Sequence, residues 1–82
     1  MPPRLPRDLS GRELVVIPRR YGYEITRTSG GHVRLTTQTG GEHHITVPSH
    51  DPLRLGTLAG ILDAVAQHNG LTRDSLVGQL WP

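Results

Sequence analysis

Apolar and polar residues alternate in three short segments in the middle of the chain. Residues 23–28, 32–37 and 44–47 each repeat with a period of two, which is typical of half-buried β-strands. Short glycine-containing segments, 29–31 and 39–42, separate them, and connections of this kind favour antiparallel hairpins. The pattern therefore predicts three consecutive strands in one antiparallel sheet.

The same period assigns each strand residue to one face of the sheet, because successive side chains point to opposite sides. One set is apolar and is expected to form the core: Tyr23, Ile25, Val33, Leu35, Ile45 and Val47. The other set is polar and carries two imidazoles and a guanidinium: Glu24, Thr26, His32, Arg34, Thr36, His44 and Thr46. We call this second face the open face, since helices are expected to cover only the first.

The segment before the strands predicts a helix over about 11–20. Ser10 and Glu13 have the spacing of a capping box, in which each side chain accepts a hydrogen bond from the backbone N–H of the other residue. Pro18 conflicts with this helix, because a proline in a helix interior removes a hydrogen bond and costs about 3 kcal/mol. We therefore expect the helix either to kink or to end about a turn early.

The last third of the chain predicts two further helices. The first has its cap at Thr57 and ends at the Asn69-Gly70 pair, and the second is capped by Thr72. We therefore expect an α+β fold in the order helix, three antiparallel strands, helix and short C-terminal helix. Residues 9–82 form a single domain in this interpretation, behind an extended N-terminal lead over 1–8.

Composition excludes several classes of protein. The chain has 82 residues, of which 34% are apolar and none is cysteine, so we expect one small domain without disulfides or thiolate metal sites. No apolar run is long enough to span a membrane, and the N-terminus lacks the apolar region of a signal peptide. We expect a cytoplasmic protein that has no membrane partner and works through its surface, because so thin a core leaves no room for a large buried site.

Charge is distributed unevenly along the chain. Residues 1–36 contain seven arginines and three acids, giving +4, whereas residues 37–82 contain two arginines and four acids, giving −2. The basic half suits a polyanion, and the flat guanidinium suits phosphate. The exclusive use of arginine over lysine is explained more simply by a GC-rich genome.

Among the five histidines, His32 has the most suggestive surroundings. It follows Gly30 and Gly31, where the backbone can approach a ligand closely, and Arg34 lies on the same face two residues further on. An imidazole titrates near neutral pH and so suits proton transfer. A lone surface histidine is nevertheless more often inert, so these residues alone leave both interpretations open.

The other histidines favour structural explanations. His43 and His44 are adjacent on a strand and therefore point to opposite faces, and no third ligand has a recognisable spacing. His68 lies late in a helix, where it can interact with the helix dipole. We therefore expect no metal ion and no other cofactor.

Five ordered segments resemble the HicA family of bacterial toxin ribonucleases. Residues 9–14 (LSGREL) and 21–24 (YGYE) resemble its first helix and first strand, and 27–35 (RTSGGHVRL) its central Gly-Ser-His motif. Residues 47–50 (VPSH) match its Val-Pro-x-His segment, and 53–62 (LRLGTLAGIL) match the start of its next helix. The similarity runs in order from about residue 5 to residue 80.

The resemblance implies a fold like that of a double-stranded-RNA-binding domain, metal-independent cleavage of mRNA, and neutralisation by a HicB-type antitoxin. The family's catalytic histidine falls on His32. In the implied reaction, neutral His32 takes the proton of a ribose 2′-hydroxyl while Arg34 and Arg27 offset charge on the phosphate. Gly30 and Gly31 would let the RNA backbone approach, and His44 is a further candidate RNA contact.

Two positions depart from the family pattern. Gly31 replaces the serine that commonly precedes the histidine, which removes a hydroxyl able to orient the imidazole or the phosphate. Pro18 stands where the first helix usually continues through an apolar residue. The alternative to an active endoribonuclease is therefore a catalytically weakened module of the same fold that binds RNA or the antitoxin.

Overall fold

The computed structural model describes residues 9–49 and 53–81. Its elements follow the expected order of a helical segment, three strands and two helices, which confirms the α+β class. In chain order they are α1 (Gly11–Leu14), α2 (Val16–Arg19), β1 (Glu24–Ser29), β2 (His32–Thr37), β3 (His43–Pro48), α3 (Leu55–His68) and α4 (Arg73–Leu80).

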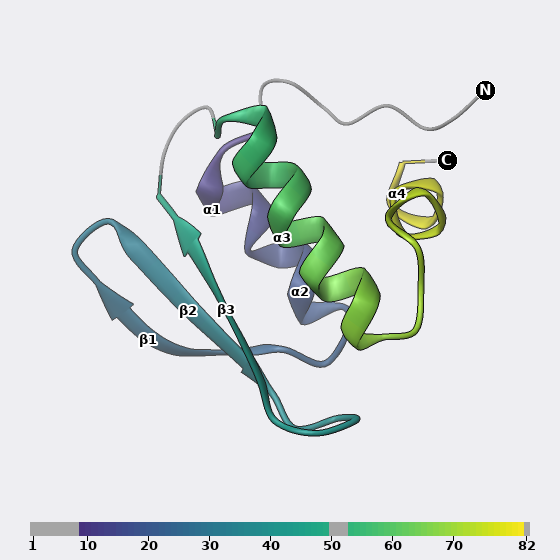
Figure 1. The fold of residues 1–82 in the computed structure, drawn as a ribbon. Helices are drawn as coiled ribbons and strands as arrows, with labels where there is room; N and C mark the ends of the chain where they lie inside the picture. Colours follow the sequence, from purple (N-terminus) through teal and green to yellow (C-terminus); the bar gives the residue numbers. More distant parts are fainter. Residues whose placement is uncertain (1–8, 50–52, 82) are drawn as a thin grey trace.

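The three strands form one antiparallel sheet in the order β1-β2-β3. Figure 1 shows that α1, α2 and α3 all lie on the same side of this sheet and that α4 lies beyond α3. Helix α3 packs against β3 and against α4, and α1 also packs against β3. Within residues 9–49 and 53–81, no helix covers the other side of the sheet, as the alternating pattern predicted.

The core lies between the sheet and the helices. Leu35 of β2 and Val47 of β3 are completely buried, as are Leu62 and Val65 of α3 and Leu76 of α4. Each occupies an apolar position of its strand or helix period, so the sequence pattern and the packing agree. Strand β1 makes the smallest contribution, because all six of its residues are exposed.

Ile25 does not belong to the core, contrary to the expectation from its period. Its residue surface is 46% exposed, although it pairs with buried Leu35 and so faces the same side of the sheet. The reason is its place on the outer strand, away from β3, where the helices pack (Figure 1). Alternation identifies the face that a side chain occupies but not whether a helix covers it.

The N-terminal helical segment reaches Arg19 but is interrupted at Val15, so the helix is broken near Pro18 as expected and does not end a turn early. The capping box of Ser10 and Glu13 forms as predicted, but Val15 separates α1 from α2. The interruption places Pro18 in the first turn of α2, where a backbone N–H has no helical acceptor. Pro18 is also among the fully buried side chains, so it contributes to the core and does not break a helix interior.

The C-terminal helices differ from the prediction at one end. Helix α3 begins at Leu55, two residues before Thr57, and its N-cap residue Arg54 provides no side-chain cap, so Thr57 was wrongly assigned as the cap. The end of α3 is as predicted, with Asn69 as C-cap and Gly70 at a φ of 70°. Thr72 caps α4 by accepting from the backbone N–H of Ser75.

Candidate nucleic-acid interface

Strand register brings the polar residues of the open face into three transverse rows. The first row contains Ser29, His32 and Pro48, the second Arg27, Arg34 and Thr46, and the third Glu24, Thr36 and His44. Directly paired residues of neighbouring strands share a face. The open face therefore has histidine at one end, two arginines in the middle and a hydroxyl–imidazole row at the other end.

An irregularity in β1 places Arg27 in the second row. Strict alternation would put Arg27 on the helix side with Ile25, but the register shifts between these two residues. Thr26 is the extra residue of this bulge, and beyond it Arg27 pairs with Arg34. The sequence gives no signal for this bulge, because its residues include no glycine.

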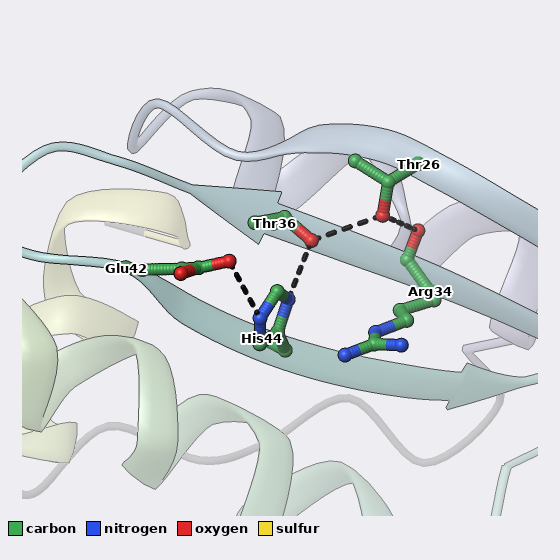
Figure 2. Close-up of polar contacts among 5 residues, drawn as sticks. All are labelled: Thr26, Arg34, Thr36, Glu42 and His44. Atoms are coloured by element: carbon green, nitrogen blue, oxygen red, sulfur yellow. Dashed lines mark hydrogen bonds and ion pairs between the residues drawn. The ribbon is translucent and has the colours of Figure 1, made fainter.

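Arg27 and Arg34 are paired across β1 and β2 and both are exposed, and Figure 2 shows that the Arg34 side chain extends toward β3. Two exposed guanidiniums in one row give this part of the open face a positive charge, and the planar fork of a guanidinium suits phosphate.

His32 is the first residue of β2 and is exposed beside the β1–β2 turn. Gly30, in that turn, has a φ of 56°, and a Cβ added at either Gly30 or Gly31 would meet no atom within 4 Å. The space next to His32 is therefore open to a ligand. Within residues 9–49 and 53–81, no hydrogen-bond partner orients its imidazole.

A chain of polar contacts crosses all three strands at the other end of the open face (Figure 2). The Thr26 hydroxyl lies 2.9 Å from that of Thr36, and the Thr36 hydroxyl lies 2.7 Å from Nδ1 of His44. Nε2 of His44 lies 3.1 Å from Oε1 of Glu42. Thr26 also donates a longer hydrogen bond, 3.4 Å, to the backbone carbonyl of Arg34. This chain ties the bulge residue to β2 and β3.

His43 points to the opposite face, as adjacent strand residues must. Its Nδ1 lies 2.6 Å from the hydroxyl of buried Tyr23, and its ring stacks on His68 with 4.5 Å between centroids. Nε2 of His68 donates to the backbone carbonyl of Thr39 over 2.8 Å. This aromatic cluster joins the β2–β3 hairpin to the end of α3, which sequence reasoning missed because its members are far apart in the chain.

Burial, followed by the nearby His68 and His44, lowers the pKa of His43. Burial also raises the pKa of Tyr23. Both directions favour the uncharged forms of His43 and Tyr23. The aromatic cluster is therefore a structural feature on the helix side of the sheet, opposite the open face that carries His44.

The predicted site residues do not line the cleft of about 560 Å³ on the helix side. This cleft is lined by other residues, among them Arg12, Val15, Ile25 and Val33. A search of the described residues finds no group of three or more side chains placed to hold a metal ion. In the same part of the chain, no helix has the length and apolar character needed to cross a membrane.

Fold and surface together define a small α+β domain with one sheet face covered by helices and the other exposed and polar. The chain belongs to the HicA toxin family of bacterial toxin–antitoxin systems, whose family model matches residues 11–66. Membership of a toxin–antitoxin system implies an antitoxin partner. No curated protein and no solved structure matches the chain.

Proposed function

We propose that this protein is an endoribonuclease toxin that cleaves mRNA in the cytoplasm without a metal ion and is neutralised by a HicB-type antitoxin. The observation that carries the proposal is the position of His32 beside the Arg27–Arg34 pair on the open face of a HicA-family chain. His32 and Arg34 are two positions apart on one strand, about 7 Å along the chain, so both side chains can reach one phosphate group.

His32 acts as the general base in this mechanism. Its neutral imidazole takes the proton of a ribose 2′-hydroxyl, and the 2′-oxygen forms a bond to the adjacent phosphorus. The bond from phosphorus to the 5′-oxygen breaks, and the leaving oxygen takes a proton from water. The products are a 2′,3′-cyclic phosphate and a 5′-hydroxyl.

Arg27 and Arg34 stabilise the charge that develops on the phosphate oxygens. Positive charge placed beside the phosphate favours the transition state, in which this negative charge develops. Gly30 and Gly31 leave the RNA backbone room to reach the base. The double-stranded-RNA-binding-like arrangement, with helices on one face only, leaves the whole strand surface accessible for this contact.

The antitoxin must cover or distort this face to silence it. An acidic surface placed over Arg34 or His32 would complement its charge, and salt would weaken such a contact.

A second function is favoured by two observations. The imidazole of His32 has no orienting partner in the described part of the chain, and Gly31 lacks the hydroxyl of the family motif. A catalytically weakened module that binds RNA or the antitoxin would have the same surface. It differs from the toxin in causing no cleavage and no growth arrest.

RNA cleavage by purified protein in EDTA tests the proposal. We expect wild type to cut single-stranded RNA to cyclic-phosphate ends and to leave intact an oligomer whose nucleotides lack the 2′-hydroxyl. His32→Ala and His32→Gln should cut at least 100-fold more slowly, because general-base catalysis contributes about that much or more. Circular dichroism should be unchanged, since His32 is exposed.

Undiminished cleavage by both variants would remove His32 from the mechanism. A strict requirement for added Zn²⁺ or Mn²⁺ would contradict the metal-independent reaction. RNA binding by wild type without cleavage or growth arrest would favour the second function.

A further inference from the structure

His44 is held at both ring nitrogens, yet it stays accessible. Its Nδ1 contacts the Thr36 hydroxyl and its Nε2 contacts the Glu42 carboxylate (Figure 2). The side chains of His44 and Glu42 are 38% and 61% exposed. An aromatic ring of fixed orientation and an accessible carboxylate therefore stand together at the end of the open face.

This arrangement is poorly suited to proton transfer at the scissile phosphate. A carboxylate only accepts hydrogen bonds, so Nε2 of His44 carries the hydrogen that points to Glu42. His32 pairs with Pro48 and His44 pairs with Thr36, so the two histidines lie four positions apart in register. Four positions span about 13 Å, and a general base must approach to about 3 Å. The two imidazoles therefore do not serve one phosphate.

A phosphate is also unfavourable beside His44, because the Glu42 carboxylate repels a second anion. The arginine pair lies one row away, about 7 Å along the strands, and is the better phosphate site. If the arginines hold the phosphate of a nucleotide, its base can lie over the third row, beside His44.

We propose that His44 and Glu42 form a subsite for a nucleobase that carries an amino group. Unstacked bases in single-stranded RNA stack on aromatic side chains, histidine included. Oε1 of Glu42 holds the imidazole, which leaves Oε2 to accept from the base. A carboxylate accepts from the amino group of cytosine, whereas uracil presents a carbonyl oxygen at that position and is repelled. This inference rests on the proposed function, since it requires RNA on the open face.

The contribution of the amino group can be measured by comparing the affinities of two uncleavable RNAs. We would titrate the full-length protein with decamers of cytidine and of uridine that carry 2′-fluorine, which removes the attacking hydroxyl. We expect the cytidine decamer to bind about five- to tenfold more tightly. Glu42→Gln should reduce this ratio to about twofold or less, because an amide both donates and accepts. Glu24→Gln, which removes a charge from the same face, should leave the ratio unchanged.

The aromatic contribution needs a separate measurement. His44→Ala should weaken binding of both decamers by at least about fivefold through lost stacking, but should not weaken binding of an abasic decamer. Equal affinity of wild type for cytidine and uridine, or a ratio that survives Glu42→Gln, would overturn the subsite. Equal weakening of all three decamers by His44→Ala would overturn it in favour of a phosphate contact.

The two proposals fail differently. Cleavage of unmodified RNA together with equal affinity for the two decamers would remove the subsite and leave the nuclease in place. Absence of any RNA binding would overturn both.

Discussion

The two faces of the sheet are built from alternate residues of the same strands, and they differ in almost every property. On the helix side, Leu35 and Val47 are completely buried, whereas their neighbours Arg34 and Thr46 on the open side are exposed. The covered face stabilises the fold, and the exposed face holds every residue proposed to contact RNA through its side chain. The difference shows that a thin domain can keep stability and function apart without a cavity.

Adjacent substitutions on β2 should separate these two properties, with the largest effect on the covered face. Leu35→Ala removes a fully buried side chain and should lower the free energy of unfolding by about 2–5 kcal/mol. Arg34→Ala should change it by no more than about 0.5 kcal/mol, because the residue is exposed. Urea denaturation measures both values.

RNA affinity should respond in the opposite way. Arg34→Ala should weaken RNA binding about tenfold or more through loss of a charge-assisted contact. A stable Leu35→Ala protein, or an Arg34→Ala protein with full RNA affinity, would show that the two faces do not divide their roles in this way.

Local signals in the sequence were sufficient to predict much of the fold and to assign most strand residues to the correct face. The capping box at Ser10 and the cap at Thr72 lie within single turns of helix, and alternation along β2 and β3 placed Leu35 and His44 on the correct faces. His32 and Arg34 were found because the hairpin and the family motif are themselves local.

Long-range features could not be predicted. Whether a strand residue is buried depends on where the helices pack, which the period of two does not reveal. Ile25 was therefore predicted to be in the core, although it is exposed on β1. The bulge that turns Arg27 to the open face depends on pairing between strands. Stacking of His43 on His68 joins residues 25 positions apart and leaves no trace in a periodic pattern.

A substitution at Pro18 tests how tightly the covered side is packed. The Pro18 side chain is fully buried in the first turn of α2, so the larger leucine side chain would clash with its neighbours. Pro18→Leu should lower the free energy of unfolding by about 1–3 kcal/mol. Val16→Ala, on the same short helix but at a residue 53% exposed, provides a control with little effect. A higher melting temperature for Pro18→Leu would show that the missing backbone hydrogen bond outweighs packing at this position.

Gly31 tests how well the open face is organised for catalysis. An added side chain there meets nothing within 4 Å, so Gly31→Ser can restore the family serine without a clash. If the hydroxyl orients His32 or the phosphate, the rate of RNA cleavage should rise about two- to tenfold, the range of one hydrogen bond.

Gly30→Ser is the matched control for this change. It adds the same hydroxyl one residue earlier, at a φ of 56° that favours glycine, and should give no gain in rate. An equal rate in wild type and Gly31→Ser would show that the serine is dispensable in this chain.

The smallest expected effect is on the pH dependence of the free energy of unfolding, which should differ between variants of the adjacent residues His43 and His44. His43 is packed against Tyr23 and His68, with His44 the next charge-bearing neighbour, and its pKa is lowered by burial and by these two histidines. The folded protein therefore binds this proton less readily than the unfolded chain does. Its stabilising contribution is complete above the ordinary histidine pKa of about 6.5 and declines as the pH falls through that value toward the lowered pKa.

The free energy of unfolding should consequently fall between pH 8 and pH 5.5, and His43→Gln should flatten this dependence. His44→Gln should leave most of it in place, because His44 stands on the open face and is held by exposed Glu42. Urea denaturation of the three proteins at several pH values measures the slopes. The opposite result, in which His44→Gln removes the pH dependence of the free energy of unfolding and His43→Gln does not, would place the controlling titration on the open face. Stability and function would then not be divided between the two faces at His43 and His44.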